Sequence, residues 1–191
     1  MNVKRIILVA LRVIGSNVRL FCGKLIHGSR LKYDPLLCIA YSDSISLSAS
    51  STLFIGKRLR TRGNCSLNVS ESGRLMIGRN VFFNRGCLVN CHYSILIGDG
   101  CEFGPNVLIY DHDLDFRSKG GIKDGSFRCK EVFLGENCWI GAGAIILRGT
   151  HVGANSVIAA GSIVKGFYPE NSLIVQKRCT EVSSISRRVS D

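Results

Sequence analysis

The chain has 191 residues, of which 46% are hydrophobic, enough for one domain with a sizeable core and an additional segment. Its 25 Lys and Arg against 14 Asp and Glu give a formal net charge of +11, which suits anionic partners such as a phosphorylated cofactor or an acidic membrane surface. The sequence has no zinc-finger spacing, recognition-helix pattern or aromatic-rich basic module, so nucleic acid is not an expected partner.

Residues 1–41 are expected to form an N-terminal cap, which is helical over most of its length. Its apolar run from Ile6 to Ile14 is interrupted by Arg12. The run is too short to span a bilayer, and no small-residue cleavage site closes it. Two interpretations stay open: a basic amphipathic helix on an anionic membrane, with peripheral contact through residues 1–30, or a helix packed on the neighbouring domain or subunit.

A six-residue period dominates the second half of the chain. Glycine directly follows the aliphatic residue in three of the hexads, and a small residue stands four places after it in most of them. The aliphatic positions are Leu134, Ile140, Ile146, Val152, Ile158 and Val164. A helix or a simple alternating strand does not produce this period. It predicts short strands joined by tight turns, three hexads to a triangular coil, with coils about 4.8 Å apart. We expect the glycines to adopt the unusual dihedral angles of the turns.

The period extends upstream in two registers that differ by two residues. Ile97, Phe103 and Ile109 keep one of these registers, and Ile77, Phe83, Val89 and Ile95 keep the other. We therefore place the repeat domain at residues 42–176 and a C-terminal tail at 177–191. Nine cysteines without a CxxC pair, several of them within the repeat, are typical of buried free thiols in a reducing cytoplasm, and no metal site is indicated.

The period stops between Ile109 and Leu134, where polar, charged and glycine residues prevail. We interpret residues 110–131 as a loop that leaves the coil. Long loops in compact domains are commonly functional. This loop begins with Asp111, His112 and Asp113, which favours a site here.

Three segments resemble the hexapeptide-repeat acyltransferases, most closely the sugar O-acetyltransferases of polysaccharide assembly. They are FFNRGCLVN (82–90), IGDGCEFGPNVLIYDHD (97–113) and LGENCWIGAGAIILRGTHVGANSVIAAGSIV (134–164). The resemblance implies an all-β chain with a left-handed parallel β-helix. It also implies a homotrimer with active sites between neighbouring subunits, and acetyl-CoA and a glycan as substrates.

The resemblance also implies roles for individual residues around the loop. His112 corresponds to the family's catalytic histidine, a general base that accepts the proton of an acceptor hydroxyl. Asn84 corresponds to an asparagine that binds the acceptor, and its amide can donate to and accept from a sugar hydroxyl. Asp111 and Asp113 are candidates for orienting the histidine or binding the acceptor. As alternatives, the aspartates are solvated charges of the loop and Asn84 is a corner amide of the coil.

For the donor, the resemblance implies a groove along the coils that holds the pantetheine arm through backbone groups at Ala142, Ala160 and Gly161. The chain departs from the family in having Ala142 where relatives often carry a hydroxyl, and in lacking the glycine-proline turn near residues 175–179. Three cations are candidates for the CoA phosphates, because a cation there meets concentrated negative charge. They are Lys165, Lys177 and Arg178.

We expect an acetyl-CoA-dependent O-acetyltransferase that modifies a sugar hydroxyl of a bacterial-type surface polysaccharide or its precursor, in the cytoplasm at the inner face of the membrane. The alternatives are an acetyltransferase with a serine or antibiotic acceptor, and a non-catalytic β-helix scaffold. A zinc carbonic anhydrase on the same fold is disfavoured, because the four histidines lack the spacing of a three-histidine site.

Overall fold

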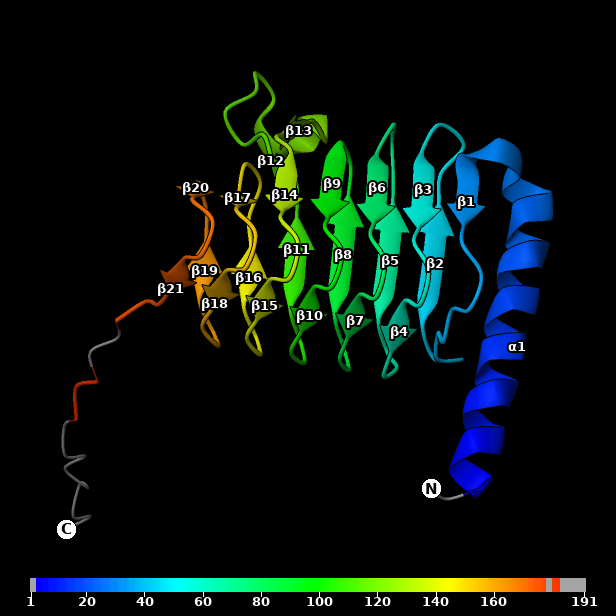
Figure 1. Ribbon diagram of the computed structural model, residues 1–191. Coiled ribbons are helices and arrows are strands. Elements are labelled where there is room, and N and C mark those ends of the chain that lie inside the picture. Colours follow the sequence, from blue (N-terminus) through cyan, green and yellow to red (C-terminus); the bar gives the residue numbers. More distant parts are fainter. Residues whose placement is uncertain (1–2, 178–179, 183–191) are drawn as a thin grey trace, which may run out of the picture.

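The chain winds into a β-helix with a long helix across one end (Figure 1). The computed structural model describes residues 3–177 and 180–182. The strands of the coils form three parallel sheets, here called faces A, B and C. Face A consists of β1 (Leu31–Tyr33), β3 (Thr52–Ile55), β6 (Arg74–Ile77), β9 (Ser94–Ile97), β14 (Val132–Leu134), β17 (His151–Val152) and β20 (Phe167–Tyr168). Face B consists of β4 (Arg60–Thr61), β7 (Phe82–Phe83), β10 (Glu102–Phe103), β15 (Trp139–Ile140), β18 (Val157–Ile158) and β21 (Leu173–Ile174).

Face C consists of β2 (Ser44–Leu47), β5 (Ser66–Val69), β8 (Leu88–Cys91), β11 (Leu108–Tyr110), β16 (Ile145–Ile146) and β19 (Ile163–Val164). The chain passes from A to B to C and back to A, so we name the turns the A–B, B–C and C–A corners. The expected left-handed parallel β-helix with an N-terminal helix is confirmed.

The coils become shorter along the chain. Leu31 pairs with Leu53, 22 residues on, whereas Ile145 pairs with Ile163, 18 residues on. The early coils are longer because faces A and C use four-residue strands there, with two inward side chains each. On β9 both Ile95 and Ile97 are buried, and this explains the two registers of the sequence period. The parallel ladder begins at Leu31, ahead of residue 42, where the repeat was expected to start.

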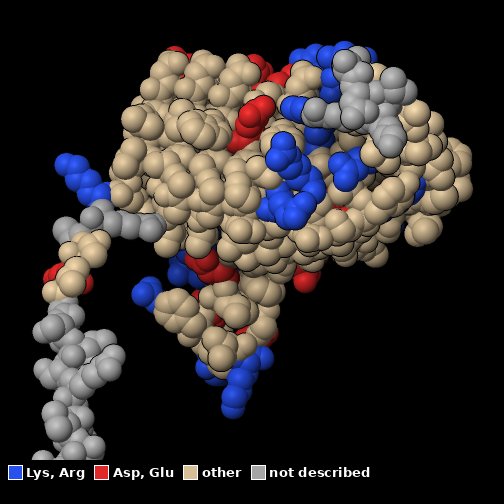
Figure 2. All heavy atoms as spheres, turned by 90° about the horizontal axis from the view of Figure 1, so that it is seen from below, with Lys and Arg blue, Asp and Glu red and all other residues tan. Residues whose placement is uncertain are grey.

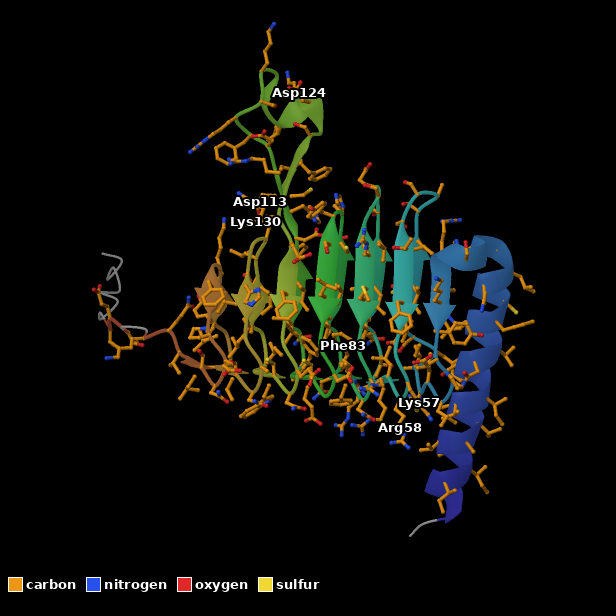
Figure 3. All side chains as sticks on the ribbon, turned by 45° about the horizontal axis from the view of Figure 1, so that its top comes forward. Lys57, Arg58, Phe83, Asp113, Asp124 and Lys130 are labelled. Carbon is orange, nitrogen blue, oxygen red and sulfur yellow. The ribbon has the colours of Figure 1, made fainter. Side chains whose placement is uncertain are left out.

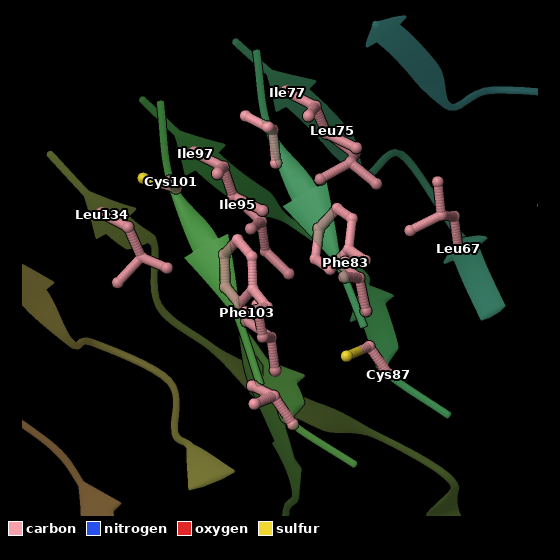
Figure 4. Packing of buried hydrophobic residues seen from close by; sticks show 14 of the residues in the cluster. Leu67, Leu75, Ile77, Phe83, Cys87, Ile95, Ile97, Cys101, Phe103 and Leu134 are labelled. Atoms are coloured by element: carbon pink, nitrogen blue, oxygen red, sulfur yellow. The ribbon is translucent and has the colours of Figure 1, made fainter. Parts of the chain in front are cut away.

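The interior is a continuous column of aliphatic and aromatic side chains (Figure 4). Phe83 stacks on Phe103, its counterpart one coil later, with ring centroids 4.4 Å apart. Buried cysteines at the corners add a polar link, because each thiol faces a carbonyl oxygen of the next coil, as Cys101 does with Gly135 at 3.1 Å. The eight described cysteines are free thiols, as expected, and burial raises the pKa of Cys91.

The glycines that follow the aliphatic residues have a different cause from the one expected. Gly135 does not have a positive φ, but a Cβ on it would lie 2.5 Å from the backbone nitrogen of Ala154. Only glycine fits at this position, because successive coils approach so closely at the corner that there is no room for a side chain. The positive φ lies two residues further on, at Asn137 (φ 54) and Asn155 (φ 56), residues that tolerate this conformation better than most. The expectation of unusual dihedrals at the glycines was therefore wrong.

Two segments depart from the coils. Helix α1 (Val3–His27) and the short η1 (Gly28–Arg30) cover the first coil, as the cap interpretation predicted. The loop between faces C and A is a hairpin of β12 (His112–Leu114) and β13 (Phe127–Cys129), with η2 (Gly121–Asp124) near its tip. This excursion rises from the C–A corner, with Asp113 and Lys130 at its base and Asp124 near its far end (Figure 3).

Candidate active site

Asp111 is the centre of a hydrogen-bond network at the C–A corner. Its carboxylate is fully buried. Oδ1 accepts the backbone N–H of His92 at 2.9 Å, and Oδ2 accepts those of Tyr93 and Ser94 at 2.7 and 2.8 Å. Nδ1 of His112 lies 3.0 Å from Oδ1. A carboxylate has about four lone-pair positions, so this one is saturated.

The network determines which nitrogen of His112 carries a proton. A carboxylate only accepts hydrogen bonds, so Nδ1 of His112 is the donor in this pair. Nε2 of the neutral ring therefore keeps its lone pair, as a general base requires. The side chain of His112 is 9% exposed, so its ring is largely shielded from water.

His92, one coil earlier, packs flat against His112. The ring centroids are 3.6 Å apart and the planes differ by 13°. Phe127 of β13 meets both rings edge-on, at 4.5 Å from His92 and 5.2 Å from His112. Desolvation and the nearby His112 lower the pKa of His92, so its ring favours the neutral form. The excursion thus returns over the corner and confines both imidazoles.

The other polar side chains at this corner come from later coils. Asp113 pairs with the guanidinium of Arg148, and Nζ of Lys165 lies 4.0 Å from the same carboxylate. Lys165 was expected at the CoA phosphates, but the structure places it beside the His112 loop. Asp113 and Lys165 are half-exposed and border the approach to His112, whereas the burial of Asp111 does not support its expected contact with an acceptor.

The residues expected to hold the donor lie at the B–C corner. Ala142 and Ala160 occupy equivalent, exposed positions of successive coils, and the backbone N–H of Gly161 donates to the oxygen of Ala142 at 2.7 Å. Asn84 lies at the same corner, where its Oδ1 accepts the N–H of Arg85 at 2.9 Å. Within one chain, face C therefore separates all four residues from His112.

Two further predicted positions lie at the C-terminal end. Lys177 is exposed and follows Gln176, whose side-chain amide bonds both backbone groups of Ile163 and closes the last coil. Arg178 lies outside the described residues. Among the residues that the structure describes, no group of three or more His, Cys, Asp or Glu could hold a metal ion.

Sequence reasoning missed the contribution of His92, and it left the role of Asp111 open. The turn Cys91–Ser94 gave no motif by itself. The spacing of the two histidines was the available indication. His92 and His112 are 20 residues apart, the same separation as between Leu88 and Leu108, which pair on face C. Recognising a 20-residue coil in this part of the chain would have placed the two histidines together.

Comparison with known proteins identifies the repeat. Residues 131–166 match the family model of the bacterial transferase hexapeptide (six repeats). The galactoside O-acetyltransferase of Lactococcus lactis is 34% identical over 124 residues, covering 60% of this chain and 56% of that protein. That of Escherichia coli is 31% identical over 121 residues, covering 62% and 58%. The chain thus spans just over half the length of these curated relatives.

A solved structure shares the fold. It is a mutant of AntD, an N-acyltransferase from Bacillus cereus, in complex with dTDP-4-amino-4,6-dideoxyglucose and coenzyme A. The TM-score is 0.61 at 16% sequence identity, with 81% of this chain and 84% of that chain covered. This likeness shows the fold, and the matched repeat together with the galactoside O-acetyltransferases confirms the resemblance to the hexapeptide-repeat acyltransferases.

Proposed function

We propose that this hexapeptide-repeat chain transfers an acetyl group from acetyl-CoA to a hydroxyl of a sugar, with His112 as the general base. The observation that carries the proposal is the pairing of His112 with the buried, saturated Asp111. It fixes the orientation of the imidazole, with Nδ1 on Asp111 and Nε2 left for the acceptor, at the edge of the fold. The names of the galactoside O-acetyltransferases among the relatives favour a sugar hydroxyl as acceptor.

The chemistry follows from the position of the free Nε2. It removes the proton of the acceptor hydroxyl while the oxygen attacks the thioester carbonyl, and the imidazolium that forms is stabilised by Asp111. The C–S bond of the tetrahedral intermediate then breaks, the ester carbonyl reforms, and the imidazolium returns the proton to the CoA sulfur. Ala142 has no side-chain donor for the oxyanion, so we assign that role to backbone N–H groups.

The site that we propose is shared between subunits. His112 lies at the C–A corner, and the donor positions Ala142, Ala160 and Gly161 lie at the B–C corner, across a face of roughly 20 Å if six extended residues are counted. A homotrimer that brings these corners of neighbouring subunits together completes the site. A shallow apolar groove on the outer side of face A is lined by Phe54, Met76, Leu96 and Phe133 and reaches the A–B corner at Gly98, and it supplies apolar surface for such packing.

We propose that the acceptor is a glycan of a surface polysaccharide or its precursor. Asn84 and Asp113 are the side chains that we assign to acceptor hydroxyls, and Lys165 joins them rather than the CoA phosphates. Lys177 is the described cation that we retain for the phosphates. The chain would act in the cytoplasm, where acetyl-CoA is available.

The test is acetyl addition measured by mass spectrometry. The purified chain is incubated with acetyl-CoA and a panel of galactosides, maltose, polysaccharide repeat units, serine and amino sugars. We expect O-acetylated sugar, a loss of at least about 100-fold in His112→Ala, and no loss in the matched variant His27→Ala at the end of α1. Acetylation of amines alone would exclude the O-acetyl assignment. No CoA release with any acceptor would favour the scaffold.

A further inference from the structure

We infer that α1 docks the protein on an anionic lipid bilayer, lying in the plane of the membrane surface. One face of the helix is apolar and has no partner in the described chain. Along it apolar residues alternate at spacings of three and four, and all are between 55% and 72% exposed. They are Leu11, Ile14, Val18, Phe21 and Leu25. We call them the α1 stripe.

The opposite face of α1 holds the helix to the first coil. Leu20 is buried there, and Oγ of Ser16 accepts the N–H of Ile39 at 2.8 Å and donates to its carbonyl oxygen at 3.0 Å. Arg19 donates to the carbonyl oxygen of Asp43 at 2.6 Å. By length and composition, Ile6–Arg30 could cross a bilayer. A helix bound along one side to the β-helix cannot do so while this contact lasts, so only its outer stripe is available to lipid.

The N-terminal end of α1 extends past the coils (Figure 1). Ile6, Ile7, Leu8 and Val9 are all at least 45% exposed, so apolar side chains project in every direction around this turn of the helix. Exposed contiguous apolar surface of this kind indicates an interaction site. An interfacial helix buries such a surface at the boundary between headgroups and acyl chains.

The charge of this part of the chain favours an anionic bilayer as the partner of the α1 stripe. Residues 1–62 contain 11 Lys and Arg and two acidic residues, which accounts for nine of the eleven net positive charges of the chain. Lys57 and Arg58 are exposed at the turn that follows β3 (Figure 3), and Lys and Arg side chains gather beside the α1 end of the molecule (Figure 2). An anionic leaflet attracts this end. A second copy placed on the same stripe would instead bring two strongly basic ends together.

The proposal is tested by vesicle flotation of the full chain. Vesicles are made of phosphatidylcholine alone or of an equal mixture with phosphatidylglycerol. We expect binding to the anionic vesicles that weakens at high salt, and a loss of about tenfold or more in the α1-stripe variant Leu11→Ser, Val18→Ser, Phe21→Ser. The matched control is Phe116→Ser, Ile122→Ser, Leu173→Ser, which removes three exposed apolar side chains far from α1 and should leave binding unchanged.

Three results with the purified protein would overturn the proposal, and a fourth comes from cells. The first is no binding of the wild-type chain to either vesicle. The second is equal binding by the α1-stripe variant and the wild type. The third is dissociation of a larger assembly by the α1-stripe substitutions in the absence of lipid, because the stripe would then be an interface between copies. In cells, release from membranes by alkaline carbonate supports in-plane docking, and retention would indicate a spanning helix.

Discussion

Replacing Asp111 with asparagine should impair both stability and catalysis. The amide keeps one acceptor oxygen and turns an NH₂ group toward backbone N–H donors, so buried N–H groups of the 92–94 turn lose their partners. We expect the free energy of unfolding to fall by about 2–4 kcal/mol. We also expect kcat to fall by about 100-fold or more, because the tautomer of His112 is no longer fixed. Urea denaturation and acetyl transfer to the best acceptor measure the two effects.

Asp115→Asn serves as the control for this substitution. Asp115 lies in the same excursion, and within the described part of the chain its carboxylate accepts only the nearby N–H of Arg117 at 3.2 Å. It should change the free energy of unfolding little. If Asp111→Asn retained wild-type kcat, Asp111 would be structural alone and the assignment of the His112 tautomer would fail.

His92 makes stability sensitive to acid. Burial and the adjacent His112 lower its pKa in the folded state, against the opposing charges of Asp111 and Glu71. The unfolded chain therefore takes up this proton first, and the native state loses stability as pH falls below the unfolded value of about 6.5. His92→Phe keeps a flat ring in the stack and removes the titration.

We expect His92→Phe to lose less stability than the wild type between about pH 7.5 and about pH 5, measured by urea denaturation at both values. Nδ1 of His92 is buried and has no hydrogen-bond partner among the described atoms, so its removal should carry little cost at neutral pH. An identical acid dependence in the two proteins would show that His92 is not the sensitive group.

At the scale of elements, the six-residue period predicted the fold because inward side chains repeat wherever a coil has three equal faces. It was accurate for residues 132–164, where strands have two or three residues. It became irregular upstream because β3, β6 and β9 have four residues, with two inward positions each. The cause of the glycines could not be read from the sequence, because close approach between coils and a positive φ favour the same residue type.

The two causes can be separated by two Gly→Ala substitutions. Gly135→Ala places a Cβ 2.5 Å from the nitrogen of Ala154 in the next coil, and neither backbone can move without breaking the ladder. Gly143 has a φ of 65° and no atom near its Cβ position, so alanine there meets only backbone strain. We expect a loss of about 3 kcal/mol or more for Gly135→Ala and about 1 kcal/mol for Gly143→Ala, from urea denaturation. Equal losses would refute the close-approach explanation.

At the scale of the whole molecule, the sequence motifs named candidate site residues but did not indicate which of them lie at the same corner. The motifs contain both His112 and the positions expected to hold the donor, yet a linear pattern does not say which corner each hexad occupies. The structure separates them across face C. Lys165 shows the same effect. Its place in the chain predicted a contact with the CoA phosphates, but it follows β19 at the end of face C and so lies at the same corner as His112.

If the active site is shared between subunits, two variants that are each inactive should regain activity when they assemble into one trimer. His112→Ala lacks the base, and Ala160→Trp fills the exposed donor corner with an indole. If each site combines the C–A corner of one subunit with the B–C corner of the next, a trimer assembled from equal amounts of both variants contains intact sites. With random assembly around a threefold axis, about one quarter of the sites are complete, so activity should return to about one quarter of the wild-type value.

The variants are mixed in denaturant and refolded together, and acetyl transfer is compared with that of each variant refolded alone. Mixing the folded proteins without exchange is the control and should give no activity, because subunits that do not exchange cannot pair an intact base with an intact donor corner. Light scattering establishes that the refolded protein is a trimer. A mixture that stays inactive in a verified mixed trimer would place His112 and Ala160 in the same subunit's site, and the donor would then have to reach across face C.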